Sequence, residues 1–193
     1  MSTTLPAIEQ LRGGVRGTVL DAEAPGYEEA RRLYNAMIDR HPALIVRCLD
    51  VADARTALAF GRRQGLEIAV RSGGHNGAGL GSVDGGLVVD LSPMNGVRVD
   101  PDRRTATVDG GALVGDLDHA THTFGLAVPA GIISTTGVGG LTLGGGHGYL
   151  TRKHGLTIDN LLSADVVLAD GSFVTAATSS LPGRRRRSLR SST

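Results

Sequence analysis

Two glycine-rich stretches contain the residue types and spacing most suited to ligand binding. The first glycine loop, RSGGHNGAGLG at residues 71–81, directly follows an apolar segment, and the second, GVGGLTLGGGHG, covers residues 137–148. Consecutive N–H groups flanked by glycine can converge on an anion, because only glycine allows such close backbone approach. His75 follows Gly73 and Gly74. Its spacing alone is as consistent with an ordinary loop histidine as with a functional one.

Neither glycine loop fits the common nucleotide-binding or hydrolase motifs. The dinucleotide fingerprint G-x-G-x-x-G fails because the third glycine position holds Ser82, Thr142 or Tyr149, depending on the starting glycine. A P-loop requires Lys followed by Ser or Thr, whereas the only lysine, Lys153, is followed by His154. No serine lies in G-x-S-x-G, which excludes the nucleophile elbow of the α/β-hydrolases.

Other reactive side chains are better explained without a functional site. Asp116, Asp118, His119 and His122 fall in one helical stretch, where a metal site is conceivable but a solvated helix face is favoured. Cys48 lies in an apolar strand and is expected to be a small buried hydrophobic residue. A single cysteine excludes a disulfide framework and a cysteine-based zinc site. We therefore predict no metal ion.

The first glycine loop follows a strand–helix–strand pattern. Residues 42–49 form an apolar run typical of a buried strand, Asp50 can cap a helix that Gly65 ends, and residues 66–71 indicate a second strand. This order predicts a βαβ unit with parallel strands. Upstream, the sequence predicts a short helix and a turn over residues 5–20 and an amphipathic helix over residues 26–39.

Past the first glycine loop the pattern changes to short strands joined by tight turns. The strand segments are GLVVDLS, VRVD and TATVDGGA, and residues 111–125 indicate one helix. The segments SADVVLAD and SFVTA are joined by Asp170-Gly171, a hairpin signal. A parallel α/β lobe thus precedes a mainly antiparallel lobe, which makes the chain α+β. Both glycine loops are expected to line the seam between the lobes.

Composition limits the classes of protein. The chain has 193 residues, of which 40% are hydrophobic and 20% charged, typical of a globular domain with two lobes. No apolar run is long enough for a transmembrane helix, and the first residues lack a signal-peptide pattern, so we expect no membrane partner and a cytoplasmic location. The dominance of Arg over Lys favours a GC-rich, bacterial source.

Charge is unevenly distributed along the chain. Five Arg residues lie in the last ten positions, and without them 15 basic and 19 acidic residues remain, a net charge of −4. Such a body does not favour nucleic-acid binding. Residues 178–193 are rich in Ser and Arg and lack periodicity, so we predict a disordered or aberrant tail, with a natural basic tail as the alternative.

Two long segments resemble a known family. Residues 66–100 and 128–171, which contain R-S-G-G-H-N and G-V-G-G-L-T-L-G-G-G-H-G, resemble the flavin-binding part of the vanillyl-alcohol oxidase / p-cresol methylhydroxylase (PCMH-type) superfamily, most nearly its berberine-bridge-enzyme-like branch. The resemblance implies a PCMH-type FAD-binding domain with FAD between two subdomains. The implied boundaries are a helical lead-in over 1–39, a first subdomain over about 40–92 and a second over 93–177.

The resemblance also implies roles for individual positions. His75 matches the histidine that bonds covalently to the flavin 8α-methyl group, and its neighbours match the loop that wraps the pyrophosphate. The second glycine loop matches the segment that runs along the cofactor, followed by an Asp-Asn pair. The residues expected to bind FAD are Arg71, Ser72, Gly73, Gly74, His75, Asn76, Gly77, Gly131, Gly137, Gly139, Gly140, Gly144, Gly148, Asp159 and Asn160.

The implied activity is that of a flavin-dependent oxidoreductase, in which a small-molecule substrate gives a hydride to flavin N5 and dioxygen reoxidises the flavin. Some members link the flavin through a second, cysteinyl bond, but Ile133 stands at that position, so we predict attachment through His75 alone. His147 stands where many members have an aromatic residue.

Family members are much longer than this chain, and the missing part contains the substrate-binding domain and the catalytic base. We therefore name no catalytic residue and leave open whether the chain alone is an enzyme. A non-catalytic truncated fragment is the alternative, and an interaction protein with a basic tail is a third, weaker hypothesis.

Overall fold

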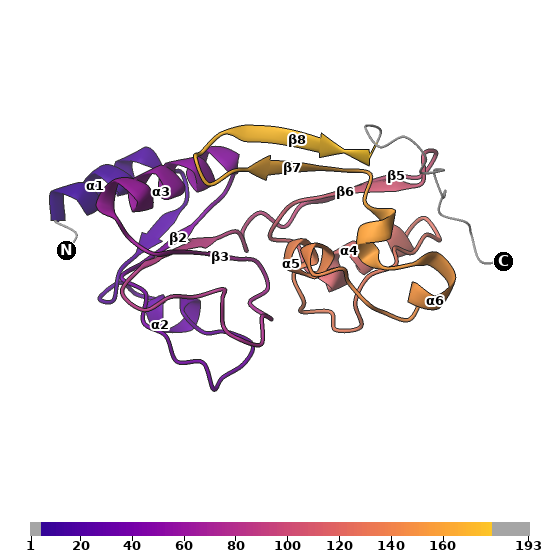
Figure 1. Ribbon diagram of the computed structural model, residues 1–193, viewed down its shortest axis with the longest axis horizontal. Coiled ribbons are helices and arrows are strands. Elements are labelled where there is room, and N and C mark those ends of the chain that lie inside the picture. The colour runs from indigo at the N-terminus through magenta and orange to yellow at the C-terminus, as the bar shows by residue number, and fades with distance from the viewer. Residues whose placement is uncertain (1–4, 179–193) are drawn as a thin grey trace.

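A four-stranded sheet forms the centre of the first lobe in the computed structural model, which describes residues 5–178 (Figure 1). Its strand order is β1 (Thr18–Leu20), β2 (Leu44–Arg47), β4 (Leu87–Asp90) and β3 (Ile68–Arg71). The three strands β2, β4 and β3 are parallel, and β1 is antiparallel to β2 at the edge. The apolar residues of β2 and β4 are buried, as expected for central parallel strands covered on both faces.

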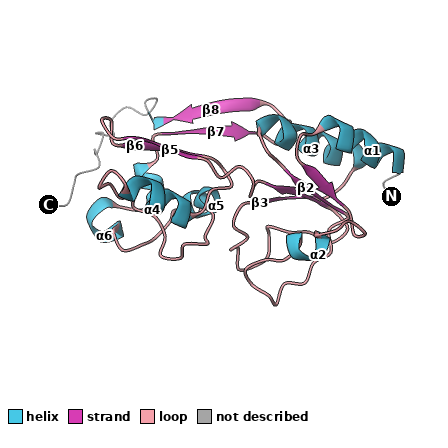
Figure 2. Ribbon diagram, turned by 180° about the vertical axis from the view of Figure 1, so that it is seen from behind, coloured by secondary structure: helices cyan, strands magenta, loops and turns pink. Residues whose placement is uncertain are grey.

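Helices cover both faces of this sheet. On one face, α1 (Leu5–Gly14) and α3 (Val51–Gln64) pack over the side chains of β2 and β4, with Phe60 of α3 in the shared core. On the other face lies α2 (Tyr27–Ala30), whose Tyr27 packs against Ile45 and Val88 (Figure 2). The predicted helix after β2 is confirmed, together with the Asp50 cap and the left-handed Gly65 at its end.

The predicted amphipathic helix over residues 26–39 is wrong beyond its first turn, because α2 ends at Ala30. Residues 31–39, here called the strap, take an irregular path instead. The Asn35 carbonyl oxygen accepts a hydrogen bond from Ile38 N, and Asn35 Oδ1 accepts one from Met37 N. An asparagine that bonds to the backbone ahead of it competes with helix formation. The strap therefore turns back toward the first glycine loop.

The existence of β1 and the position of β4 in the sheet were not predicted. The segment expected to be a helix and a turn over residues 5–20 also contains the edge strand β1. The expected parallel strands β2 and β3 are parallel, but they are not neighbours, because β4 lies between them. This insertion brings the carboxyl ends of three parallel strands to one edge of the sheet, beside the first glycine loop.

The second lobe is built on the hairpin of β5 (Val97–Asp100) and β6 (Thr105–Val108), which is antiparallel as predicted. The helix expected over 111–125 is shorter, forming α4 (Val114–His122), because Asp116 Oδ2 accepts a hydrogen bond from Leu113 N and fixes the first turn there. Val114 and Leu117 of α4 pack with Ala130 and Val138 in the lobe's core. Three short helical segments follow: α5 (Val138–Leu143), α6 (Thr151–His154) and the 3₁₀ helix η1 (Thr157–Asn160).

A final antiparallel hairpin extends along both lobes (Figure 1). It consists of β7 (Ser163–Val167) and β8 (Phe173–Ala177), with the predicted turn at Asp170-Gly171. At this turn, Arg55 Nε of α3 donates a hydrogen bond of 3.0 Å to the Gly171 carbonyl oxygen. The hairpin thereby connects the second lobe to the first. The tail predicted over 178–193 lies, from residue 179 onward, outside the described residues.

Candidate functional site

The two glycine loops meet at the seam between the lobes. Gly73 and Gly137 approach so closely that a Cβ at Gly73 would collide with the backbone N of Gly137, and a Cβ at Gly137 would collide with Ser72 Oγ. Here the absence of a side chain is a steric requirement, whatever the backbone angles. The expectation that both loops lie at the seam is confirmed by this contact.

A cavity of about 340 Å³ opens beside the contact between the loops. Many of the predicted FAD-binding residues lie in its wall: residues 71–76 from the first glycine loop and Gly137 and Gly140 from the second. Thr136 and Leu141 complete the wall on the side of the second lobe. The volume is in the range of small-molecule sites.

The remaining predicted residues do not line this cavity. Asp159 Oδ2 accepts a hydrogen bond from Leu156 N at 3.0 Å, and Asn160 Nδ2 donates to the carbonyl oxygens of His154 and Leu156 at 3.1 and 2.9 Å. The Asp-Asn pair thus shapes the turn between α6 and η1. The predicted residues outside the cavity wall are Gly77, Gly131, Gly139, Gly144, Gly148, Asp159 and Asn160.

The first glycine loop presents a row of unused backbone donors. Within the described part of the chain, the N–H groups of residues 73–77 donate no hydrogen bond. Asn76 Oδ1 accepts hydrogen bonds from Ala78 N and Leu80 N, both at 3.1 Å, and this fixes the turn that follows. Gly74 has a φ of 68°, a left-handed conformation that turns the backbone within this row of N–H groups. Such a donor row suits an anionic group, so these residues fit the pyrophosphate of FAD.

Arg71 is buried beneath the first glycine loop. Its Nη2 atom lies 3.0 Å from Asp90 Oδ2, and both side chains are almost fully buried. Asp90 is the register partner of Arg71 at the end of β4, so the pair joins two strand ends. Arg71 Nη1 and Ser72 Oγ are buried without a hydrogen-bond partner among the described residues. Both residues line the cavity, and a buried unpaired donor beside a cavity favours a polar ligand there.

The His75 imidazole is held from three directions. The Tyr34 ring of the strap stacks on it with ring centroids 3.8 Å apart and planes 19° apart. His75 Nε2 lies 2.9 Å from Thr135 Oγ1, and Nδ1 lies 3.4 Å from Thr136 Oγ1. Partial burial lowers the pKa of His75 below its ordinary 6.5, and a hydrogen bond with Thr135 opposes this shift. The neutral ring is therefore favoured.

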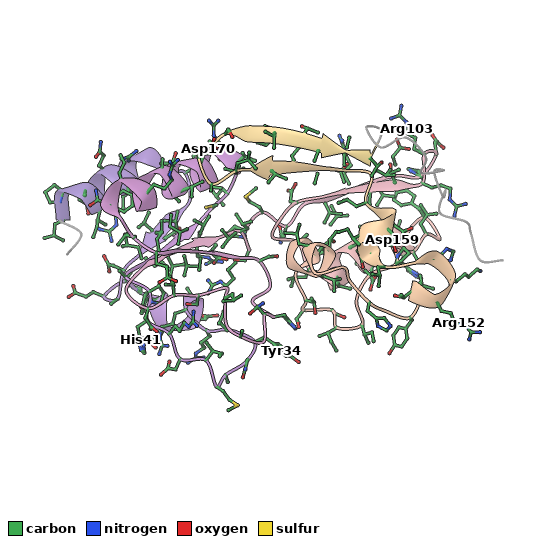
Figure 3. The ribbon with its side chains drawn as sticks, in the orientation of Figure 1. Tyr34, His41, Arg103, Arg152, Asp159 and Asp170 are labelled. Carbon is green, nitrogen blue, oxygen red and sulfur yellow. The ribbon has the colours of Figure 1, made fainter. Side chains whose placement is uncertain are left out.

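Sequence reasoning missed the partners of both key side chains. Tyr34 was assigned to a helix that the structure replaces by the strap, and Figure 3 shows it on the side of the first lobe that faces the second. Thr135 and Thr136 directly precede Gly137, so two adjacent hydroxyls before a glycine run were an available signal. Asp90 ends an apolar strand as Arg71 does, and this shared position could have suggested their pairing.

The acidic and histidine residues of α4 form no recognisable metal centre. In residues 5–178, no group of three or more His, Cys, Asp or Glu side chains is placed to share a metal ion. Asp116 instead caps the helix, and burial raises the pKa of Asp118. No helix among residues 5–178 has the length and apolar character that crossing a bilayer requires.

Comparisons with known proteins identify the family of this chain. A family model described as FAD binding domain matches residues 42–177. Berberine bridge enzyme-like 27 from Arabidopsis thaliana is 37% identical, with 69% of this chain and 26% of that protein covered. The structure of 6-hydroxy-D-nicotine oxidase from Arthrobacter nicotinovorans superposes with a TM-score of 0.86 at 35% identity, covering 94% of this chain and 39% of that one.

A third similar protein carries a covalently bound flavin. Glucooligosaccharide oxidase from Acremonium strictum, with a 6-S-cysteinyl, 8α-N1-histidyl FAD, superposes with a TM-score of 0.80 at 32% identity, covering 90% of this chain and 37% of that one. The chain spans about a third of the length of the curated relatives that it matches. The predicted α+β, PCMH-type fold and the resemblance to the berberine-bridge-enzyme-like branch are confirmed. This chain therefore belongs to the FAD binding domain family of the FAD-linked oxidoreductases.

Proposed function

We propose that this chain is the flavin-holding part of an FAD-dependent oxidase and that His75 alone bonds covalently to the flavin. The observation that carries the proposal is one cavity wall that combines the unused N–H groups of residues 73–76 with an imidazole held by contacts from both lobes. The histidyl flavin of the related glucooligosaccharide oxidase supports it. A second, cysteinyl link is not proposed, because Ile133 occupies the corresponding position and cannot form one.

Each group of the cavity wall has a distinct task in this proposal. The N–H groups of residues 73–76 bind the pyrophosphate, and the buried, unpaired Nη1 of Arg71 adds positive charge on the same side. Gly137 allows the second lobe to close against this loop without a side chain in the way. When bound, the isoalloxazine ring supplies hydride acceptance from substrate and electron transfer to dioxygen.

The attachment of His75 is a balanced oxidation. A new bond between an imidazole nitrogen and the 8α carbon replaces one imidazole N–H and one methyl C–H bond. The two protons and two electrons that are released end on dioxygen as hydrogen peroxide. His75 must be neutral to act as the nucleophile, and its partial burial favours that form.

We further propose a division of labour between this chain and the part of the relatives that it does not span. The subdomains over about 40–92 and 93–177, with the lead-in over 1–39, hold the cofactor. A small-molecule substrate binds mainly to residues outside this chain, since the relatives are about three times as long. This chain alone then shows little or no turnover, even with flavin bound.

Acid precipitation of the purified protein tests the covalent bond. We expect flavin absorbance in the wild-type pellet and, for His75→Ala, only in the supernatant. His41→Ala is the matched control, because His41 is an exposed histidine near α2, away from Tyr34 (Figure 3). Wild-type flavin found only in the supernatant keeps FAD binding but overturns the covalent bond. A folded wild-type chain without flavin overturns the proposal and supports the non-catalytic fragment.

A further inference from the structure

We infer that Tyr34 and Thr135 are positioning residues that hold the His75 imidazole with its Nδ1 lone pair toward the cavity. The inference rests on the covalent attachment proposed above, and it adds which side chains orient the ring. Two contacts from opposite lobes carry it: the stacked Tyr34 ring of the strap and the Thr135 hydroxyl of the second lobe.

The two ring nitrogens of His75 differ in how closely a threonine hydroxyl approaches them. A neutral imidazole has one N–H donor and one lone pair. The contact between His75 Nε2 and Thr135 Oγ1 is 2.9 Å, whereas that between Nδ1 and Thr136 Oγ1 is 3.4 Å. Either tautomer can pair with a threonine hydroxyl, and we assign the proton to Nε2, at the shorter contact, which leaves the lone pair on Nδ1. Thr136 lines the cavity and Thr135 does not, so the Nδ1 edge of the ring faces the cavity.

The Tyr34 contact fixes the plane of the ring. With centroids 3.8 Å and planes 19° apart, the tyrosine covers one face of the imidazole and prevents rotation out of that plane. Tyr34 is still 64% exposed, and its hydroxyl has no hydrogen-bond partner among residues 5–178. The aromatic face, rather than the hydroxyl, is therefore the part that acts.

The strap holds Tyr34 in place through the first glycine loop. Tyr34 N donates a hydrogen bond of 3.3 Å to the Gly74 carbonyl oxygen, one residue before His75. Ile38 lies against Gly79 so closely that a Cβ there would come within 2.7 Å of Ile38 Cγ2. Because the strap is anchored at Tyr34 itself and again at Ile38, the stack is a built feature of the fold.

The rate of covalent attachment tests both contacts. Apoprotein is mixed with FAD, and flavin that stays with the protein after acid denaturation is measured over time. Tyr34→Ala and Thr135→Val are each expected to slow attachment by about tenfold, since a misplaced nucleophile loses its orientation. Tyr34→Phe and Thr135→Ser keep the stack and the hydroxyl and should keep the wild-type rate. Met37→Ala is the matched control for the strap, because Met37 is 90% exposed.

A second readout does not depend on flavin. The ¹⁵N chemical shifts of His75 in the apoprotein report which ring nitrogen carries the proton, and His75→Ala identifies the signal. We expect the Nε2-protonated form in the wild type and a mixture of tautomers in Thr135→Val. The amount of FAD bound to the native protein is also measured before acid denaturation. This distinguishes a variant that does not bind FAD from one that binds FAD but does not form the covalent bond.

The outcomes separate the two proposals. Unchanged attachment rates in Tyr34→Ala and Thr135→Val, or a wild-type ring protonated on Nδ1, overturn the positioning inference while the covalent bond stands. If the wild type forms no covalent bond, the proposed function fails, and the tautomer comparison still decides whether Thr135 orients the ring. Should Tyr34→Ala not fold, Thr135→Val and Tyr34→Phe still test the inference.

Discussion

At the scale of single residues, the pKa of His75 predicts how flavin attachment depends on pH. Partial burial keeps the pKa of the folded protein's His75 below 6.5. The attachment rate should therefore rise with pH through that lowered pKa and stay constant above about pH 7, where the ring is neutral. Initial rates of covalent incorporation between about pH 5 and 8 measure this profile. A rate that decreases as the pH rises through this range would contradict the nucleophilic role.

The same shift has a consequence for stability with a definite sign. In the unfolded chain His75 has its ordinary pKa of 6.5, so the unfolded state binds a proton more readily than the folded state. The contribution of His75 to the free energy of unfolding is therefore present above 6.5 and decreases as the pH falls below it. Replacing His75 by Ala should reduce the acid dependence of urea unfolding in this window.

The burial of Cys48 predicts that its thiol is unreactive in the folded protein. Burial raises its pKa to about 12, with a further contribution from the charge of Asp53. The side chain is fully buried in the core of the first lobe, as the sequence predicted, although the expected strand β2 ends one residue earlier, at Arg47. Because the thiolate is the reactive form, Cys48 should not react with a thiol reagent in the native protein at pH about 8 and should react fully in denaturant. Rapid labelling of the folded chain would show that the first lobe opens locally.

These residues show how far sequence reasoning extends at this scale. His75 and the glycine loops could be singled out because their unusual composition is local. Tyr34 could not, because its stack on His75 depends on the path of the strap, and that path depends on contacts with Gly74 and Gly79 about 40 residues later. The pairing of Arg71 with Asp90 likewise required knowing that β3 and β4 are neighbours.

At the scale of elements, Asp53 joins the start of α3 to the strands beside it. Its carboxylate is buried and accepts hydrogen bonds from Arg16 N at 2.8 Å and from Gly17 N and Leu49 N at 2.9 Å. Asp53→Ala leaves three N–H groups without this acceptor and should lower the free energy of unfolding by about 2–4 kcal/mol, as measured with urea. Exposed Asp102→Ala is the control and should change it by less than about 0.5 kcal/mol.

The close contact between the two glycine loops predicts that adding a single methyl group to either loop weakens FAD binding. In Gly73→Ala or Gly137→Ala, the new Cβ collides with backbone or side-chain atoms of the other loop, so the lobes must separate. Both variants should lose most FAD binding by titration while keeping the helical circular dichroism of the first lobe. Gly13→Ala is the control, because a Cβ there meets no atom within 4 Å. FAD binding at wild-type strength in Gly73→Ala would show that the loops need not touch.

Elements with local signals were predictable, and those with remote partners were not. The boundaries of α3 followed from Asp50 and Gly65, which act within one turn of the helix. The Asp170-Gly171 hairpin was visible for the same reason. In contrast, β1 is only three residues long and is a strand because it pairs with β2. The position of β4 between β2 and β3 depends on how the chain connects across the sheet, which no local signal specifies.

At the scale of the whole molecule, the β7–β8 hairpin presents apolar side chains to solvent. Every residue of β8 is exposed, and Phe173 and Val174 are 45% and 39% exposed. Apolar surface of this kind is usually covered by another part of a protein, and the relatives have about two thirds of their length outside this chain.

This surface predicts the behaviour of the isolated chain. The wild-type chain should self-associate at micromolar concentration, as measured by sedimentation velocity. Phe173→Lys and Val174→Lys should shift it toward the monomer, because a charge at the surface opposes apolar contact. Glu29→Lys, an exposed change in α2, should not. If the wild-type chain stays monomeric at micromolar concentration, the exposed apolar residues of the hairpin do not drive self-association.

The contacts that join the two lobes link residues far apart along the chain, which has a consequence for its synthesis. His75 meets Thr135 sixty residues later, and Arg55 meets Gly171 across 116 residues. A nascent chain that has not yet left the ribosome beyond Thr135 has the donor loop but no orientation of the imidazole. Since such distant contacts form slowly, we expect FAD to bind only after most of this chain has emerged from the ribosome. A higher concentration of FAD in the cell should then speed binding to the finished site, but it should not make the site form earlier.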